Sequence, residues 1–426
     1  MESRGRRGLP HSLGASQPAY IRAYELGTDR RGGPSANSGC SCLCLADVFP
    51  AKRAMIIGPR QIKVICVGPA IKVRGGISTV IGHTRNRFPA HIRFRIVPTF
   101  SEYTGNDEPA RGSRLIQAGV FLAALCRISA TALIWRRTVF HVHLSEKGST
   151  IRKGLVCIVL RALRCRYIVH AHAATDALFH PWVPLTVRRL LLWGIGGSEC
   201  FLALTQFWAQ YYATALKSHA TQIVVLPNPV ELPAEIPERS DRDGLRLLFL
   251  GRIGDRKGAF EVIRAFGALP PDVRNRCSLT LAGDGELEAA RALAATLGCP
   301  DRVSIPGWVD RSEVVRLLGE AEVLLLPSRG EGMSNALLEG MAWGLAVVTS
   351  AAGGADEFLH PGVDAILVEP GDTDAIRTAI AELDTNPAFR VSLGLAARKT
   401  AGRFCIEGYV DRLSRLYESL ASTPRT

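Results

Sequence analysis

The sequence predicts an α/β protein built from two doubly wound domains in tandem. The first observation is length, because 426 residues exceed what one typical core encloses and suit two domains. The second is the alternation of short β-branched runs with helix-length segments, which is typical of βαβ units on a parallel sheet. The third is residues 230–244, a stretch rich in proline and charge that separates two such series.

The first series defines an N-terminal domain, residues 55–235. Its apolar runs are bounded by glycine, proline or polar turns, as strands of a parallel sheet are. The predicted strands are 62–68, 93–100, 138–144, 165–172, 200–205 and 222–230. Residues 1–54 are rich in Arg, Gly, Ser and Pro without sustained periodicity, so we interpret them as a disordered extension or an over-long gene start and exclude them from the fold.

The second series defines a C-terminal domain, residues 236–405. Its predicted strands are 245–251, 277–283, 302–307, 322–328, 345–350 and 364–370, with helices at 258–270, 285–298 and 312–321. Residues 406–426 are predicted to form a helix that packs back on the N-terminal domain. Because ligands of such sheets bind at the carboxyl ends of the strands, the predicted site is the cleft between the two domains.

Charge is divided unevenly between the two halves. Residues 1–235 hold 30 Lys+Arg against 12 Asp+Glu, a net +18, whereas residues 236–426 hold 22 against 27, a net −5. A basic surface suits nucleic acid, anionic lipid or an acidic substrate. No nucleic-acid-binding signature accompanies the charge, so nucleic acid is not expected as a partner.

Cysteine usage indicates a reducing compartment. The eleven cysteines are mostly single and embedded in apolar runs, as buried thiols of a cytoplasmic protein are. The one cluster, Cys40, Cys42 and Cys44, lacks metal-ligand spacing. Residues 115–135 have the length to span a bilayer, but their glutamine, arginine, serine and threonine favour a packed or interfacial helix.

Two glycine-rich loops follow the first predicted strand of each domain. Gly75 and Gly76 stand where a strand meets a helix, so backbone N–H groups there can approach a phosphate or sugar; a plain tight turn is the alternative. Arg252 and Lys257 lie on the corresponding loop of the second domain. Arginine binds phosphate oxygens bidentately and lysine adds a mobile point charge, which favours a diphosphate clamp over a solvated basic turn.

The stretch GEGMSNALLEGMAWG (330–344) follows a predicted strand end. Ser334 or Asn335 can cap a short helix that stops at the last glycine. Glu331 precedes this helix, and Glu339 leans back toward its N-terminus, as helical side chains do. A helix N-terminus attracts an anion, and carboxylates accept hydrogen bonds from sugar hydroxyls. The pattern therefore favours a ligand with phosphate between two polyols, which is the shape of a nucleotide sugar.

These residues carry a family resemblance. The Glu331–Glu339 pair resembles the E-x7-E signature of the retaining GT-B glycosyltransferases of the large fourth family. Further matches occur in family order between residues 62 and 370: GG (75–76), VHAHAA (169–174), LPNPV (226–230), GRIGDRKG (251–258), LAGDGEL (281–287) and IPGWVD (305–310). The resemblance implies the GT-B fold, in which two Rossmann-like doubly wound domains face each other across a cleft.

The resemblance also implies roles for individual residues. The implied catalytic residues are His172, Glu331, Arg252 and Lys257. The implied donor-binding residues are Gly75, Gly76, Arg252, Lys257, Met333, Ser334, Asn335 and Glu339. Within this set, Glu331 would contact the transferred sugar and Glu339 the ribose. His172 would lie near the sugar, and His170 would take that role if the register were shifted. The non-functional alternative is a structural histidine at a strand end. Ala173 and Met333–Ser334 depart from the usual family residues, which leaves sugar specificity open.

The predicted function is a retaining transfer of a hexose-type sugar from a nucleotide diphosphate sugar to a glycan or lipid-linked acceptor, in cell-surface polysaccharide or glycolipid biosynthesis. No cofactor or metal is expected, because the Asp-x-Asp at 241–243 has arginine between its acids and lies in the linker. A nucleotide-sugar 2-epimerase and a non-catalytic nucleotide-sugar-binding partner are the alternatives. The base (UDP or GDP), the sugar, the acceptor and the oligomeric state stay open.

The N-terminal domain is predicted to hold the acceptor. Residues 55–235 alone carry 22 Lys+Arg against 8 Asp+Glu, a net +14. Together with the apolar stretch 115–135 and the basic, apolar stretch 152–166, this charge favours docking on an anionic membrane, on the inner face of the cytoplasmic membrane. The acceptor would then be polyprenyl-linked or a glycolipid. An ordinary basic surface over packed helices is the alternative.

Overall fold

The computed structural model describes residues 61–71, 73–100, 113–135, 137–145, 147–172, 178–216, 221–238 and 244–423. These residues belong to one compact unit. The segment 1–54, its cysteine cluster, Ala173 and the acidic pair of residues 241–243 all lie outside the described part.

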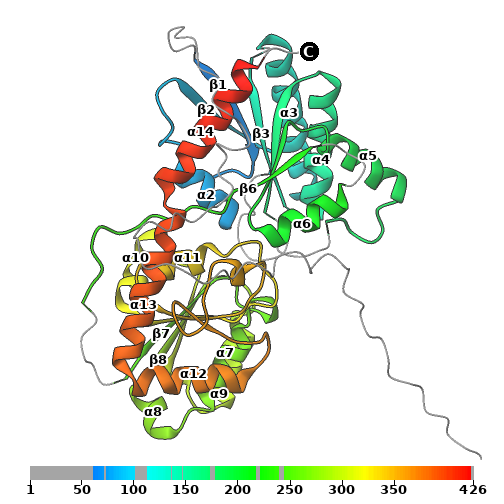
Figure 1. The fold of residues 1–426 in the computed structure, drawn as a ribbon. Coiled ribbons are helices and arrows are strands. Elements are labelled where there is room, and N and C mark those ends of the chain that lie inside the picture. Colours follow the sequence, from blue (N-terminus) through cyan, green and yellow to red (C-terminus); the bar gives the residue numbers. More distant parts are fainter. Residues whose placement is uncertain are drawn as a thin grey trace, which may run out of the picture. The chain divides into compact units, whose positions relative to one another are not determined.

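The N-terminal sheet has six parallel strands in the order β2-β1-β3-β4-β5-β6 (Figure 1). The strands are β1 (Ile62–Gly68), β2 (Ile92–Pro98), β3 (Val139–Leu144), β4 (Arg166–Ala171), β5 (Cys200–Ala203) and β6 (Gln222–Val225). Every residue of β3 and β4 is buried, as expected of central strands that are covered on both faces. All six predicted strands are present, although β6 stops well short of residue 230 because Pro227 and Pro229 lack the N–H that a ladder needs.

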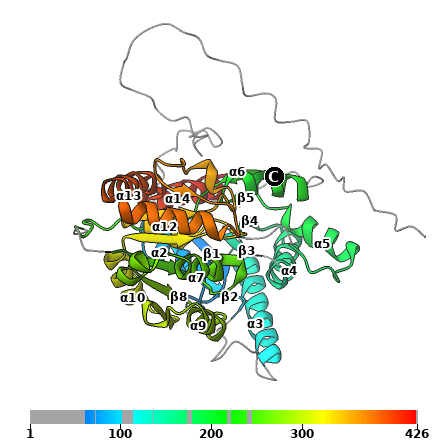
Figure 2. The same ribbon diagram turned by 90° about the horizontal axis from the view of Figure 1, so that it is seen from below.

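Helices cover both faces of this sheet (Figure 2). They are α2 (Gly76–Thr84), α3 (Ser113–Ile134), α4 (Gly148–Ala162), α5 (Leu185–Ile195) and α6 (Gln206–Ala215). One core joins the sheet to α3 through α6, with Ala124, Val156, Ile195 and Trp208 among its members. The other face packs against α2 and a helix from the end of the chain, α14 (Ile406–Ser422).

The C-terminal sheet also has six parallel strands, in the order β12-β11-β10-β7-β8-β9. They are β7 (Arg246–Leu250), β8 (Ser278–Ala282), β9 (Val303–Gly307), β10 (Val323–Leu326), β11 (Ala346–Thr349) and β12 (Ile366–Leu367). The helices are α7 (Ala259–Gly267), α8 (Pro271–Arg276), α9 (Leu287–Thr296), α10 (Arg311–Glu320), α11 (Asn335–Ala342), α12 (Thr373–Thr385) and α13 (Pro387–Ala401). All six strands predicted for this domain are present, and the predicted α/β fold of two doubly wound sheets is confirmed.

Helix α14 follows the C-terminal domain in sequence but packs on the N-terminal sheet. Tyr409, Leu413 and Tyr417 lie in the core that α14 forms with β1, β3 and α2. The guanidinium of Arg166 on β4 donates hydrogen bonds to carbonyls at the end of this helix, those of Leu420 and Thr423. The last described helix therefore completes the core of the first domain.

Helix α3 differs from its neighbours in how little of it is buried. Its inward stripe is narrow and consists of Ala124, Ile128 and Ala132. Among the described helices, it is the one long and apolar enough to cross a membrane, and only 17% of its most apolar window is buried. The apolar composition of α3 is therefore not explained by packing inside the domain.

The strand order reverses at one point in each sheet. In the N-terminal sheet this point lies between β1 and β3, and in the C-terminal sheet between β7 and β10. Ligands of doubly wound sheets bind beyond the carboxyl ends of the strands at such points. The loops that follow β7 and β10 approach each other closely, since a Cβ on Gly258 (φ +75°) would lie 2.4 Å from the carbonyl oxygen of Pro327.

Candidate functional site

The short helix α11 begins where the sequence predicts. Ser334 is the N-cap, and its side chain accepts a hydrogen bond from the backbone N–H of Leu337 at 3.4 Å. Gly344, with φ +69°, ends the helix. Asn335, the alternative cap, instead donates from Nδ2 to the carbonyl of Gly76 at 3.0 Å. The helix N-terminus thus lies against the N-terminal glycine loop.

Glu331 is held in place on several sides. Its side chain pairs with Lys257, and Ser328 Oγ donates to Glu331 Oε1 at 2.8 Å. Its carbonyl accepts a hydrogen bond from Trp208 Nε1 on α6 at 3.1 Å. Glu331 is 9% exposed, so this carboxylate is one wall of a small pocket beside α11 rather than a solvated surface group.

Glu339 occupies a separate position on the same helix. Its carboxylate pairs with Arg311 at the start of α10, and the side chain is 14% exposed. A second small pocket is lined by Glu339, Asn335 and residues of the N-terminal domain and linker, among them His83 and Glu231. The two glutamates of the E-x7-E pair are therefore each bound to a different cation and line different pockets.

The two cations of the expected clamp pair with different carboxylates. Lys257 is 14% exposed and contacts Glu331, whereas Arg252 is 56% exposed and pairs with Asp284 at 3.4 Å. The guanidinium of Arg256, on the same loop, donates a hydrogen bond to the carbonyl of Gly330 at 2.9 Å and so links this loop to the loop after β10. The structure thus brings Lys257 to the E-x7-E stretch and leaves Arg252 at the more open end of the same loop.

The backbone before α11 is fixed from outside the C-terminal sheet. Asn228, which follows β6 and is buried, donates from Nδ2 to the carbonyl of Met333 at 3.0 Å. The backbone N–H of Asn228 lies 3.3 Å from the sulfur of the same methionine. The LPNPV segment therefore positions the loop that carries Met333 and Ser334, a role that the sequence alone did not assign to it.

His172 lies just beyond β4 and is partly exposed, while His170 is inside the strand and fully buried. The structure therefore places His172, not His170, at the accessible carboxyl end of the sheet. His172 Nε2 is 3.0 Å from Nδ1 of His143, at the end of the neighbouring strand β3. Burial lowers the pKa of His172 to about 3, so the ring is neutral at physiological pH.

Two contact residues were missed by sequence reasoning. Arg311, the partner of Glu339, stands directly after the quoted IPGWVD segment, but nothing in its local sequence distinguishes it from a solvated helix arginine. His143 had a visible signal, because it ends the H-x-H of VFHVHL and alternate strand residues share a face.

In chemical terms the site combines positive charge, carboxylates and a neutral imidazole. Lys257, Arg252 and the N-terminus of α11 can hold a diphosphate and stabilise charge that builds on it. Glu331 and Glu339 can accept hydrogen bonds from hydroxyl groups on either side. The N-terminal glycine loop meets this group through Gly76 and Asn335.

Fold and site together define a GT-B protein, with two Rossmann-like parallel sheets and glycine-containing loops at their switch points. A comparison with solved structures agrees. The Anabaena protein Alr3699/HepE matches with a TM-score of 0.63 over 84% of this chain and 100% of that chain, at 16% sequence identity. At that level of identity the likeness concerns the fold.

The chain belongs to the glycosyl transferases group 1 family. Residues 244–386 match this family. D-inositol 3-phosphate glycosyltransferase of Acidothermus cellulolyticus is 30% identical over 332 residues, which is 72% of each chain. The amylovoran biosynthesis glycosyltransferase AmsK of Erwinia amylovora is 32% identical over 240 residues, 53% of this chain and 57% of that one. For several curated relatives, the chain spans about half of their length.

Proposed function

We propose that this protein is a glycosyltransferase that moves a hexose-type sugar, with retention of its anomeric configuration, from a nucleotide diphosphate sugar to a glycan or lipid-linked acceptor. The observation that carries the proposal is the placement of Glu331 and Glu339 on either side of the α11 N-terminus, with Lys257 on the first of them. This arrangement suits phosphate flanked by two polyols. Family membership supports the same activity.

The donor would exchange contacts with groups that are already paired. Lys257 holds the Glu331 carboxylate, and a diphosphate would compete with that carboxylate for the lysine. Glu331 would then be released to accept hydrogen bonds from the hydroxyls of the transferred sugar. Arg311 and Glu339 would act in the same way toward the ribose. Because each charge keeps a partner throughout, binding avoids the large cost of an unpaired buried ion.

Bond breaking would be assisted mainly by charge stabilisation. As the bond to the anomeric carbon lengthens, negative charge gathers on the departing diphosphate, and Lys257, Arg252 and the α11 N-terminus stabilise it. The diphosphate itself would accept the proton of the acceptor hydroxyl, so no protein nucleophile is required. His172 would hydrogen-bond the sugar, and His143, 3.0 Å away, would fix the orientation of that ring. No metal or cofactor takes part in this scheme.

For the nucleotide, we propose a uridine diphosphate sugar. HepE of Anabaena, which shares the fold, was crystallised in complex with UDP-glucose. For the biological setting we propose cell-surface polysaccharide or glycolipid synthesis in the cytoplasm, in line with the role named for AmsK in amylovoran biosynthesis.

For the acceptor, we propose a lipid-linked saccharide at an anionic membrane. Exposed apolar side chains gather on α3 and around α5: Leu115, Ile116, Leu122, Leu133, Ile134, Trp135, Trp182, Leu185, Leu190 and Trp193. Helices α3, α4 and α5 pack in series on one side of the sheet (Figure 2). Cations accompany them, and the Arg161 guanidinium lies 4.1 Å from the ring centroid of Trp193. Exposed apolar anchors within a domain of net charge +14 suit an anionic lipid surface.

One experiment tests the reaction. The purified chain is screened by thermal shift against UDP and GDP, and is then incubated with the matching nucleotide sugars and membrane-extracted acceptor. UDP at a hundred times its Kd is expected to stabilise the native state by about 2.7 kcal/mol. A glycosylated product with the same anomeric configuration as the donor, seen by NMR, is expected. Inverted product would overturn retention, and free sugar with nucleotide but no glycoside would favour the 2-epimerase.

A second measurement tests the membrane contact. Co-sedimentation with anionic liposomes at moderate salt is expected, with neutral liposomes as the control. Equal recovery in both supernatants would remove the membrane from the proposal and leave the transfer reaction standing.

In the turnover experiment, absence of product with every donor, together with retained nucleotide binding, would indicate a non-catalytic partner.

A further inference from the structure

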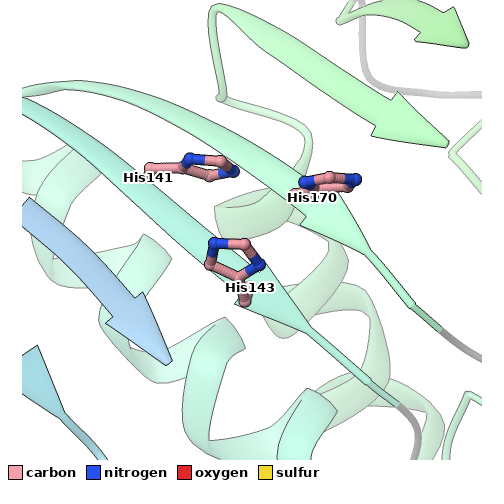
Figure 3. Close-up of side chains that lie close together, drawn as sticks. All are labelled: His141, His143 and His170. Carbon is pink, nitrogen blue, oxygen red and sulfur yellow. The ribbon is translucent and has the colours of Figure 1, made fainter. Parts of the chain in front are cut away.

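Histidines gather on one face of the N-terminal sheet, on strands β3 and β4. His141 and His143 alternate along β3, so both side chains leave the same face of the sheet. His170 on β4 is the direct neighbour of His143 in the strand register. An H-x-H on one strand and a histidine opposite it on the next thus place three imidazoles side by side (Figure 3).

The three rings are close and fully enclosed. The candidate ligand nitrogens of His141, His143 and His170 all lie within 4.8 Å of one another. The ring centroids of His141 and His143 are 4.2 Å apart, and each lies 5.4 Å from that of His170. Exposure is 3% or less for all three, because α14 and the strand ends cover this face.

One nitrogen of His141 and one of His143 take part in hydrogen bonds, whereas other ring nitrogens of the cluster are unused. Nδ1 of His141 lies 2.6 Å from the Tyr417 hydroxyl on α14, and Nδ1 of His143 lies 3.0 Å from His172. Among the described residues, no hydrogen bond of regular geometry reaches Nε2 of His141 or either ring nitrogen of His170, and the backbone of Leu226 interacts with the His170 ring only weakly. His141 shows the division usual for a metal-binding histidine, with one nitrogen free for the ion and the other bonded to an outer partner that fixes the ring.

The charge state of the rings suits coordination as well. Burial is the main cause that lowers the pKa of His141 to about 3 and holds those of His143 and His170 well below the ordinary value. The backbone of Leu226 acts on His170 in the opposite sense and is the weaker effect. A neutral imidazole is the form that binds metal ions, and buried nitrogens without partners carry a free-energy cost that coordination removes.

We propose that His141, His143 and His170 form a buried binding site for a borderline divalent transition ion, with Zn²⁺ as the preferred occupant. Three imidazoles match zinc, copper and nickel better than calcium or magnesium, which prefer oxygen ligands. Zn–N bonds of about 2.0–2.1 Å require the three nitrogens to close to about 3.4 Å of one another in tetrahedral geometry. The rings must tilt out of their present near-parallel stack for the three nitrogens to converge on one ion. The bound ion joins β3 to β4 and, through Tyr417, to α14.

This site is structural, and it is connected to the proposed transfer reaction only through His143, which also orients His172. Its three ligands are buried residues of β3 and β4, and none of them lines either of the small pockets beside α11. The link to the reaction site is His172, which hydrogen-bonds His143 without belonging to the ligand set. Metal content and stability are therefore the proper readouts, whatever the enzymatic activity turns out to be.

The test measures zinc in protein that has been unfolded and refolded with one equivalent of ZnCl₂ and then dialysed against metal-free buffer. About one zinc per chain is expected by mass spectrometry, together with a higher Tm than in protein refolded without zinc. His141→Gln and His170→Gln should each lower the zinc content at least tenfold. His360→Gln, at an exposed histidine in the other domain, should retain it.

Circular dichroism checks that the variants fold. If either fails to fold, the wild-type chain refolded with Co²⁺ gives the second measurement, in which X-ray absorption should show three imidazole ligands. Zinc at the level of the dialysis buffer in the wild-type chain would overturn the proposal. So would undiminished zinc in folded His141→Gln and His170→Gln, because the ion would then be bound elsewhere.

Discussion

Each of the two domains is built on a six-stranded parallel sheet, but their buried polar groups differ in how their charge is compensated. In the C-terminal domain each glutamate of the site has a cation, Lys257 for Glu331 and Arg311 for Glu339. In the N-terminal domain the buried imidazoles stack on one another in the neutral form, and Lys153 has a threonine hydroxyl as its hydrogen-bond acceptor. Paired ions keep their charge and can exchange partners with a charged substrate. Groups buried without a counter-ion give up their charge instead.

The largest effect is expected from breaking the Lys257–Glu331 pair. Lys257→Ala should lower turnover at least a hundredfold, since a cation on the departing diphosphate contributes about 3 to 4 kcal/mol to the transition state. Glu331→Ala should abolish transfer as well, because the sugar loses its hydroxyl acceptor. Steady-state kinetics give the measurement, with circular dichroism as the check on folding. Arg316→Ala, at an exposed helix arginine, is the control.

Wild-type turnover in folded Lys257→Ala would show that the pair serves packing only. The paired charges of the C-terminal domain would then have no role in the reaction.

The close approach of the loops that follow β7 and β10 predicts the next effect. Gly258→Ala should destabilise the chain by about 2 to 4 kcal/mol, because the new Cβ adds a 2.4 Å clash with Pro327 to the strain of a positive φ. Gly298→Ala is the matched control: it has φ +66° but nothing within 4 Å, so about 1 kcal/mol is expected. Urea unfolding measures both. Equal losses would mean that the loops can separate without cost.

A third prediction concerns Lys153 on α4. Burial is the main cause that lowers its pKa to about 7; Arg152 acts in the same direction, and the thiols of Cys66 and Cys157 oppose it. Its folded pKa lies below the unfolded value, so the unfolded chain binds more protons between about pH 7 and pH 10. Wild-type stability should therefore rise with pH in that window.

Lys153→Met removes this dependence. The gain in free energy of unfolding over the wild type should be larger at pH 7 than at pH 9, by up to about 2 kcal/mol. Thr99 keeps a partner in the variant, because its hydroxyl also donates to the carbonyl of Gly68 at 3.2 Å. The exposed Lys399→Met is the control. A pH-independent difference between variant and wild type would contradict a lowered pKa.

The smallest effect is expected on the outer face of α3. Replacing both Leu133 and Ile134 by serine should weaken binding to anionic liposomes about tenfold, since each exposed side chain loses part of its burial in the interface. Stability should change little, because neither side chain lies in the core. The pair Val391→Ser and Leu395→Ser, exposed on α13 of the acidic domain, is the control. If liposome binding is unchanged, the outer face of α3 is not the membrane contact.

The fold was predictable from the sequence because central parallel strands are buried on both faces and read as nearly continuous apolar runs. Strand ends were not, as β6 shows: the apolar run continues to residue 230, but prolines end the ladder at Val225. The N-terminus of α11 was also predictable, since capping depends on neighbouring residues.

Contacts between distant segments could not be predicted in the same way. Asn228 and Met333 are separated by more than a hundred residues, and so are Trp208 and Glu331. Arg252 and Lys257 lie five positions apart, yet one faces Asp284 and the other Glu331, because the loop between them turns at Gly254. Spacing along a loop does not fix the directions of its side chains.

The packing of α14 on the N-terminal sheet sets an order for folding during synthesis. The ribosome must finish almost the entire described chain before Tyr409, Leu413 and Tyr417 are available to cover β1 and β3. Until then the part of this apolar face that α14 covers stays open to water, while the C-terminal domain can close its own core. The domain that is made first is therefore completed last, and its stability depends on residues from the far end of the chain.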